Sequence, residues 1–326
     1  MTIPHTMKAI LAAADEALKV GNVSLPAVNG NDVLVKVAAA GLNRADLIQR
    51  MGKYPPPPGA SDIMGLEIAG TIASIGSDVT RWSVGDRVCG LLSGGGYAEY
   101  ASVDAGSLLF IPDEMDMVQA CCFPESLFTV WANVFDRGRL QKGEDFLCHG
   151  GTSGIGVMAL QMARHFGAGK IYATAGTDKK CDLAQSLGAD AAINYKQEDF
   201  ETRVKAGGGV DVILDMVGGD YIQKNINCAK LNGRIVNIAY QNGFAAEVNF
   251  APVLMKRLSL NATTLRARSA DEKRGIRDAV EKQFWPLVFN GTIKPVLDRV
   301  FAFEEAEAAQ AYMQSGGHSG KIILKL

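Results

Sequence analysis

The sequence predicts an α/β protein with two domains, a β-rich domain and a domain built on a doubly wound parallel sheet. The chain has 326 residues, which is long enough for two hydrophobic cores. Up to about residue 115 the apolar segments are short and β-like, and from about residue 145 strands and helices alternate. Alternation of this kind is typical of a parallel sheet with helices on both faces.

The β-rich part is predicted from short apolar runs separated by Gly, Asn and Pro. The expected strands are residues 7–13, 32–40, 67–76, 86–92 and 97–103. One helix is expected at residues 43–50, with Asn43 at its N-cap. The run YPPPPG after it, residues 54–59, predicts a stiff, extended loop.

The second part is predicted from a regular succession of strands and helices. The expected strands are residues 146–150, 170–176, 191–195, 210–217, 233–239 and 258–265. A helix such as 178–188, which ends at a glycine, connects two of them. The tail adds a helix near 271–290, a strand at 296–303, a helix at 304–314 and a last strand at 321–326.

Composition excludes several classes of function. A net charge of −2 gives no reason to expect nucleic acid or an anionic membrane surface as a partner, and no apolar run is long enough to span a membrane. The six cysteines form no C-x-x-C pair, so we expect free thiols and a cytoplasmic location.

The stretch HGGTSGIG, residues 149–156, admits three interpretations: a dinucleotide cradle, a loop that presents Ser153 as a nucleophile, or a plain glycine-rich turn. A dinucleotide loop needs little bulk at the positions that Gly151, Ser153 and Gly156 occupy. A nucleophile elbow needs glycine at the fifth position, where Ile155 stands. The place of the loop between the first strand and first helix of the alternation favours the dinucleotide.

Three further segments carry a resemblance to a known family. They are AAAGLNRADLIQRMGKYPPPPGASDIMGLEIAG, VGDRVCGLLSGGGYAEYASV and SGKIILKL. With the domain order they resemble the medium-chain dehydrogenase/reductase superfamily. The run LNRADLIQRMGKYPPPPG is similar to zeta-crystallin-like quinone oxidoreductases, especially the stress-inducible NADPH quinone reductases. The resemblance implies a GroES-like catalytic domain from residues 1–124 and 269–326, and a Rossmann domain at 125–268.

Zinc-dependent members of that superfamily have a cysteine where this chain has Asn43, and Gly-His-Glu where it has Gly65-Leu66-Glu67. Leucine cannot coordinate a metal, so no tetrahedral site can be assembled there. The four histidines are scattered without ligand spacing. We therefore expect no metal, and we expect Glu67 to be a structural carboxylate.

The resemblance implies that Asn43, Asp46 and Tyr54 line the catalytic pocket. Tyr54 would donate a hydrogen bond to a quinone oxygen, and Asn43 would anchor the cofactor ribose or the substrate. Asp46 would contact the substrate or orient the loop. The alternative is that Asn43 only caps its helix and Tyr54 only packs on the prolines.

The expected cofactor is NADPH. The second strand of the Rossmann domain ends at Gly176-Thr177 without an acid, and Lys180 follows on the first helical turn, within reach of a 2′-phosphate. The resemblance adds contacts from Thr129, Tyr195 and Lys321, the last to the pyrophosphate. The expected cofactor-binding residues are Asn43, Thr129, Gly151, Thr152, Ser153, Gly154, Ile155, Thr174, Gly176, Thr177, Lys180, Tyr195, Val217, Gly218, Ile238 and Lys321.

Three functions remain open. The first is NADPH-dependent reduction of quinones without a metal. The second is reduction of the double bond in enals, enones or enoyl thioesters, and the third is a non-catalytic, crystallin-like NADPH-binding protein. The nearly uncharged segment 258–265, last in the strand order, also predicts a homodimer joined at that edge.

Overall fold

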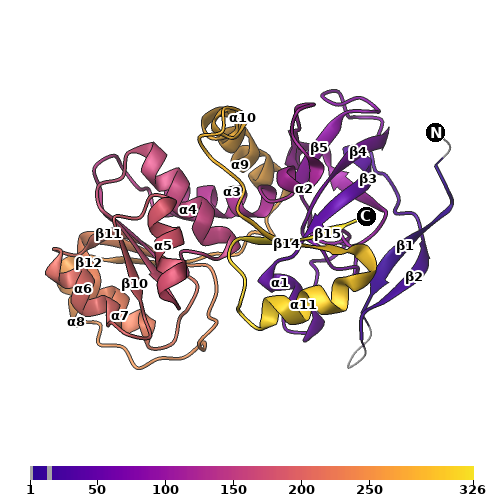
Figure 1. Ribbon diagram of the computed structural model, residues 1–326. Helices are drawn as coiled ribbons and strands as arrows, with labels where there is room; N and C mark the ends of the chain where they lie inside the picture. The colour runs from indigo at the N-terminus through magenta and orange to yellow at the C-terminus, as the bar shows by residue number, and fades with distance from the viewer. Residues whose placement is uncertain (1–2, 13–16) are drawn as a thin grey trace. The chain divides into compact units, whose positions relative to one another are not determined.

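The computed structural model describes residues 3–12 and 17–326. The chain forms two compact units (Figure 1). One contains the residues up to Phe128 together with Leu265–Leu326, and the other is Thr129–Thr264. The sequence placed these boundaries after residues 124 and 268.

The first unit is built around a seven-stranded sheet in which β3 (Asp32–Gly41) is central. β3 pairs antiparallel with β4, β6 and β15. The other strands are β4 (Glu67–Ile75), β5 (Arg87–Leu91), β6 (Tyr100–Asp104), β7 (Leu108–Phe110), β14 (Leu297–Ala302) and β15 (Lys321–Lys325). A separate two-stranded ribbon holds β1 (Thr6–Leu11) and β2 (Lys19–Ser24). The strand expected at 7–13 thus ends at Leu11, and residue 13 lies outside the described residues.

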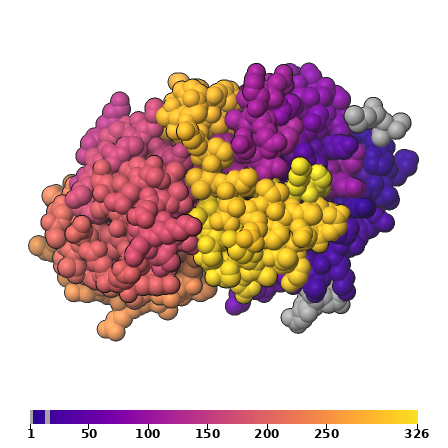
Figure 2. Space-filling view, in the orientation of Figure 1, coloured from indigo at the N-terminus to yellow at the C-terminus, as the bar shows by residue number. Residues whose placement is uncertain are grey.

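The C-terminal segment completes the sheet that the N-terminal segment begins. Ile323 of β15 lies opposite Gly41 of β3. The helix α11 (Ala306–Gln314) contacts α1 (Arg44–Arg50), and Figure 2 shows the yellow C-terminal surface against indigo N-terminal residues. Ile322 and Leu324 are fully buried in this shared core. Residues from both ends of the chain can therefore meet in one site.

The remaining helices of this unit are α2 (Met117–Ala120), α3 (Pro124–Val130), α9 (Ala270–Gln283) and α10 (Trp285–Phe289), with α3 running on into the second unit. The single helix expected at 271–290 is wrong, because the structure divides it at Phe284. Pro286 explains the division: it has no N–H to donate to the preceding turn, and it is well tolerated in the first turn of a new helix.

The second unit holds six parallel strands in the order β10-β9-β8-β11-β12-β13. Their bounds are β8 (Phe146–Cys148), β9 (Ile171–Ala175), β10 (Ala191–Asn194), β11 (Val210–Asp215), β12 (Ala229–Asn237) and β13 (Ser259–Ala262). The connecting helices are α4 (Gly154–Phe166), α5 (Asp178–Ser186), α6 (Phe200–Ala206), α7 (Tyr221–Cys228) and α8 (Ala251–Lys256). The strand order reverses between β8 and β11, and in such sheets ligands bind at the carboxyl ends beside the reversal. The doubly wound sheet is confirmed.

The edge strand β13 is shorter than expected. It covers Ser259–Ala262 rather than 258–265 and pairs with β12. The chain returns to the first unit at Leu265, which is 8% exposed. Across the described residues, no helix is long and apolar enough to cross a bilayer.

Candidate functional site

The glycine-rich loop connects β8 to α4 and ends at a well-formed helix N-terminus. Ser153 is the N-cap residue, and its Oγ accepts a hydrogen bond from the Gly156 N–H at 3.0 Å. The other side-chain neighbour of this hydroxyl is Met216 Sδ at 3.6 Å, which is no general base. Ser153 is therefore a cap, and the free N–H groups of the first turn suit an anion such as a phosphate.

Two glycines in the loop are required by close packing. A Cβ at Gly151 would lie 2.7 Å from the Cβ of Ala173 in β9. A Cβ at Gly156 would collide with the carbonyl oxygen of Gly150. The loop therefore packs tightly on β9 and on its own backbone at these two glycines, as a pyrophosphate-binding loop requires. Thr152, Gly154 and Ile155 complete this turn and the start of α4.

A buried polar network lies directly beneath the loop. His149 Nδ1 contacts Thr174 Oγ1 at 3.1 Å, and His149 Nε2 contacts Asn225 Oδ1 at 2.7 Å. The Asn225 amide donates to Asp215 Oδ2 at 3.1 Å, and Asn237 donates to the same oxygen at 2.8 Å. Burial lowers the pKa of His149, although Asp215 and Asn225 oppose it, so the imidazole is held neutral.

The network fixes several of the predicted cofactor residues. Thr174 Oγ1 also accepts the Gly150 N–H at 3.2 Å, which ties it to the loop. Asp215 Oδ1 accepts the N–H groups of Val217 at 2.7 Å and Gly218 at 3.3 Å, and the Asp215 carbonyl accepts the Ile238 N–H at 2.8 Å. Sequence reasoning missed this network. Its only local signal was a polar residue at the end of an apolar strand, Asp215 in β11.

The corner predicted to select the cofactor is assembled in the second unit. Thr177 caps α5, its Oγ1 accepting the Lys180 N–H at 3.3 Å. The Tyr195 hydroxyl lies so close to Gly176 that a Cβ there would be 2.6 Å away. The nearest acid, Asp178, accepts a hydrogen bond from Asn194 at 2.6 Å and so faces β10. The corner thus presents a lysine and a half-exposed tyrosine hydroxyl.

Thr129 lies at the end of α3 and is 7% exposed. Its carbonyl oxygen accepts a hydrogen bond from the Asn133 side chain at 2.8 Å. Asn133 belongs to a π-helical segment, Trp131–Arg137, and single π turns recur at functional sites. Thr129 therefore lies where the α-helix changes into a π-helix. A contact between its hydroxyl group and a cofactor stays a prediction.

In the first unit, a buried ion pair lies beside Asn43 and Glu67, the residues around which the sequence predicts that no metal binds. The Lys321 ammonium pairs with Glu67 Oε1 and donates to Asn43 Oδ1 at 2.8 Å and to the Leu42 carbonyl at 3.0 Å. The Asn43 amide in turn donates to Glu67 Oε1 at 2.9 Å. Burial alone would lower the pKa of Lys321, but the Glu67 carboxylate outweighs it and raises the pKa.

This arrangement does not fit a zinc ion. Leu66 offers no donor atom, and the oxygens of Asn43 and Glu67 already serve an ammonium that a dication would repel. Within residues 3–12 and 17–326, no group of three or more His, Cys, Asp or Glu could hold a metal. Glu67, which is 0% exposed, is a structural carboxylate as expected.

The same geometry corrects one expected cofactor contact. The three ammonium N–H groups of Lys321 all have protein acceptors, and the side chain is 3% exposed. A pyrophosphate contact would need at least one of these donors. We therefore remove Lys321 from the cofactor-binding residues and place it in the framework around Asn43.

Asp46 is enclosed by protein. Its Oδ2 accepts hydrogen bonds from the Asn43 N–H at 2.7 Å and the Tyr97 hydroxyl at 2.8 Å, while its Oδ1 has no partner. Burial raises the pKa of Asp46 to about 6; Asn43, Tyr97 and Lys321 oppose the rise and Glu67 adds to it. The carboxyl group bonds to the backbone at the start of α1, which is the geometry of a structural residue. The expected role in orienting the loop stays a prediction.

Tyr54 is held by an arginine from the far end of the chain. Arg266 Nη1 donates to the Tyr54 carbonyl at 2.9 Å, and its guanidinium lies 5.2 Å from the centre of the Tyr54 ring. Arg266 also donates to the Ser93 carbonyl at 2.8 Å and to Gln49 Oε1 at 2.8 Å. Burial and then Glu125 raise the pKa of the Tyr54 phenol, and Arg266 opposes them. The ring therefore packs on a cation, a contact that sequence reasoning missed.

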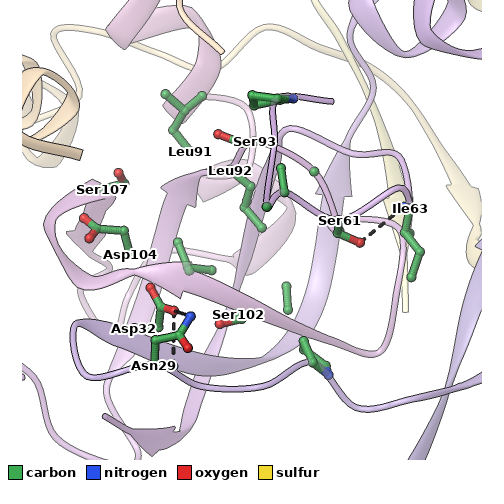
Figure 3. Close-up of a pocket in the computed structure, with 18 of the residues that line it drawn as sticks. Asn29, Asp32, Ser61, Ile63, Leu91, Leu92, Ser93, Ser102, Asp104 and Ser107 are labelled. Atoms are coloured by element: carbon green, nitrogen blue, oxygen red, sulfur yellow. Dashed lines mark hydrogen bonds between the residues drawn. The ribbon is translucent and has the colours of Figure 1, made fainter. Parts of the chain in front are cut away.

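A cavity of about 720 Å³ adjoins this arginine within the first unit. Its walls come from the loop after Tyr54, residues 57–61, from Leu91–Gly95, from β6 and from residues 266–273. Figure 3 shows Asp32 and Asp104 on one side of it, Leu91, Leu92 and Ser93 on another, and Ser61 with Ile63 on a third. The lining combines apolar side chains such as Leu91 and Leu92 with polar and charged ones such as Ser93, Asp104 and Lys273.

The comparisons with known proteins agree with this architecture. Residues 29–113 match the alcohol dehydrogenase GroES-like domain, and residues 154–281 match the zinc-binding dehydrogenase family. The rat quinone oxidoreductase is 29% identical over 320 residues, covering 95% of this chain and 94% of the relative. A phenolphthiocerol/phthiocerol polyketide synthase from Mycobacterium tuberculosis is 30% identical over 314 residues, and this chain spans only 14% of its length.

Solved structures give the same result. The Escherichia coli quinone oxidoreductase complexed with NADPH superimposes with a TM-score of 0.85 and 27% identity, over 98% of this chain and 100% of the other. The CurK enoyl reductase superimposes with a TM-score of 0.84 and 27% identity, over 99% of both chains. Both family models match in the same order along the chain, and the neighbouring structures superimpose over nearly its whole length. The chain belongs to the medium-chain dehydrogenase/reductase superfamily.

Proposed function

We propose that the protein is a metal-independent oxidoreductase that uses NADPH to reduce quinones. The observation that carries the proposal is the buried Lys321–Glu67 pair, which with Asn43 takes up the oxygens that a metal ion would need. Oxidation of an alcohol requires loss of a proton from a very weakly acidic hydroxyl, which a metal normally makes possible. A quinone accepts hydride without that help, because the oxyanion formed is delocalised over the ring.

NADPH would supply the hydride. The glycine loop and the N-terminus of α4 would hold its pyrophosphate, and the network under the loop would keep Val217, Gly218 and Ile238 in place beside it. Lys180 and Tyr195 would bind the 2′-phosphate at the corner that lacks a free acid. These assignments come from the geometry of the loop and from the similarity to an enzyme complexed with NADPH.

Tyr54 is the residue that we assign to the acceptor. Its phenol hydroxyl would donate to the quinone oxygen on which negative charge develops. The resemblance also placed Asn43 and Asp46 at the reacting centre. The Asn43 side chain contacts Lys321 and Glu67, and Asp46 Oδ2 accepts from Tyr97. They would hold the loop that carries Tyr54, and solvent would supply the proton that completes the reduction.

A second candidate is reduction of a carbon–carbon double bond in an enone or enoyl thioester. The similarity to the CurK enoyl reductase favours it, since its TM-score and identity match those of the quinone oxidoreductase almost equally. A double bond conjugated to a carbonyl also takes hydride without a metal, and the same tyrosine would serve the carbonyl oxygen.

The test is NADPH oxidation followed by absorbance with an ortho-quinone, a para-quinone and an enone as acceptors. Turnover of the quinones with little turnover of the enone is expected. A preference for the enone would replace the proposal with the second candidate, and no turnover of any acceptor would favour a non-catalytic NADPH-binding protein.

The six cysteines are buried and free, which supports our proposal of a reducing, cytoplasmic location.

A further inference from the structure

Two nearly buried cations line the cavity beside Tyr54. Arg266 is 4% exposed and Lys273 is 7% exposed, and both contribute to the cavity walls. Lys273 Nζ donates to Ser93 Oγ at 2.7 Å and to the Arg266 carbonyl at 2.9 Å. The acceptors of Arg266 are the carbonyls of Ser93 and Tyr54 and the amide oxygen of Gln49. Every one of these acceptors is neutral.

Buried charges in proteins are normally paired, because an unpaired one loses its hydration without compensation. In the part of the chain that the structure describes, neither Arg266 nor Lys273 forms an ion pair, and two guanidinium N–H groups and one ammonium N–H have no protein acceptor. Burial lowers the pKa of Lys273, and Glu125 and Asp104 oppose this only from a distance. The cations therefore lack a counter-ion.

The carboxylates of the cavity do not fill that need. Asp32 accepts hydrogen bonds from the Asn29 side chain at 2.9 Å. Asp104 Oδ1 accepts the Gly106 N–H at 2.9 Å. Burial raises the pKa of Asp104, and Gly106, Arg274 and Lys273 oppose the rise without forming an ion pair with it. Arg268 adds a third cation to the lining. The lining thus holds three cationic side chains, and Arg266 and Lys273 keep N–H groups without a protein acceptor among the described residues. The two acids of the same segment, Asp271 and Glu272, are exposed and are not part of the lining.

We propose that this cavity binds an anionic substituent, a carboxylate or a sulfonate, on the acceptor that the enzyme reduces, with Arg266 and Lys273 as its recognition cations. The inference rests on the proposed function, because it places the anchor beside the residue assigned to the quinone oxygen. Arg266 joins the two, since it stacks on the Tyr54 ring and lines the cavity. The enzyme would therefore select acidic quinones over neutral ones.

The direct test compares ortho-naphthoquinone with ortho-naphthoquinone sulfonate in the NADPH oxidation assay. In the wild type the KM for the sulfonate is expected to be about tenfold lower than for the parent quinone, the gain of one or two charge-assisted hydrogen bonds. Lys273→Met is expected to abolish this difference and to leave the KM for the parent quinone within about twofold. Lys273→Arg keeps the charge and is expected to restore most of the preference.

A thermal melt separates ligand recognition from a structural role. Replacing an unpaired buried cation by an apolar side chain of similar length leaves stability equal or higher. Lys273→Met is therefore expected to keep or raise the Tm, whereas a lysine needed for its bonds to Ser93 and Arg266 would lower it on removal. Arg44→Gln, which changes an exposed arginine of the same unit, is the matched control and is expected to change neither KM nor Tm.

Binding measured without NADPH distinguishes this proposal from the proposed function. By calorimetry, naphthalene sulfonate is expected to bind the wild type and to bind Lys273→Met at least about tenfold more weakly. That result with no turnover of any quinone would overturn the proposed function and keep the anion site. Equal KM values for both quinones, or inorganic sulfate binding as tightly as naphthalene sulfonate, would overturn the acceptor subsite and leave quinone reduction standing.

Discussion

Folding favours the protonated form of the Asp46 carboxyl group over the ionised form. Its Oδ1 has no partner, and burial raises its pKa to about 6. A pKa raised by folding means that the folded state binds the proton more tightly than the unfolded chain. The contribution to stability is therefore fully present below the unfolded pKa of the group and is lost as the pH rises through about 6.

The free energy of unfolding should show this loss. Between pH 4.5 and pH 7, Asp46 is expected to take about 2 kcal/mol from the wild type, and Asp46→Asn, which cannot titrate, removes that loss. Denaturant unfolding of both proteins at the two pH values isolates the effect, because the other carboxylates are common to both. An unchanged difference between wild type and variant at the two pH values would refute the raised pKa.

Tyr54→Phe tests the residue assigned to the acceptor. Loss of the hydroxyl is expected to lower kcat for quinone reduction about tenfold, because one hydrogen bond to the developing charge is lost. The KM for NADPH should stay nearly constant. Tyr312→Phe removes a hydroxyl that donates to Asp298 in the same unit, and serves as control. Full activity of Tyr54→Phe would leave the ring as a packing partner of Arg266.

Lys180→Ala tests the choice of cofactor. A charge-assisted hydrogen bond to the 2′-phosphate contributes about 1.5–3 kcal/mol, so the KM for NADPH should rise about ten- to a hundredfold while that for NADH changes little. Lys179→Ala removes the neighbouring, exposed lysine and should affect neither. Equal use of both cofactors by the wild type would contradict the assignment of this corner.

Single residues show most clearly where sequence reasoning ends. The cap at Asn43 and the glycine loop were predictable, because their partners lie within a few positions, as Asn43 and Asp46 do. Arg266 holds a residue 212 positions away, and Lys321 donates to one 278 positions away. No local pattern predicts such pairs. The resemblance assigned Lys321 to a phosphate, and the fold instead buries its charge beside Glu67.

At the scale of elements, hydrophobic patterning was sufficient wherever burial decides the pattern. All six strands of the parallel sheet were predicted. The residues of β8 and β9 are buried on both faces, which gives a continuous apolar run, whereas the edge strand β13 is only partly buried. β2 and β7 were missed, because β2 is half exposed and β7 has only three residues. α9 and α10 were joined into one helix, because amphipathic spacing continues across Phe284 although the hydrogen-bonded ladder does not.

The edge strand β13 carries our prediction of a homodimer. Leu260 of this strand is 43% exposed, and Leu254 and Met255 of the neighbouring α8 are 79% and 76% exposed. An unpaired strand edge with apolar side chains beside it favours pairing with a second copy. Sedimentation at micromolar concentration should show a dimer for the wild type.

Leu260→Lys should shift the sedimenting species toward the monomer, because a charge on an edge strand opposes pairing. Val84→Lys, which changes an exposed residue of the other unit, should leave the dimer intact. A wild-type monomer, or a Leu260→Lys dimer as stable as the wild type, would show that the two copies do not meet at β13.

At the scale of the whole molecule, each unit contributes something different to the proposed reaction. The second unit supplies a glycine cradle whose shape is fixed by a fully buried polar network. The first unit draws on both ends of the chain to enclose an ammonium where zinc-dependent relatives would place a metal. Together they support our proposal that the protein reduces its acceptor with NADPH and without a metal ion.

The most direct test measures zinc content and NADPH-dependent quinone turnover in the same sample, before and after treatment with a chelator. We expect zinc far below one ion per chain and a turnover that the chelator leaves unchanged, because Leu66 and the Lys321 ammonium leave no place for the ion. About one tightly bound zinc per chain, with turnover lost on its removal, would show that the reaction depends on a metal.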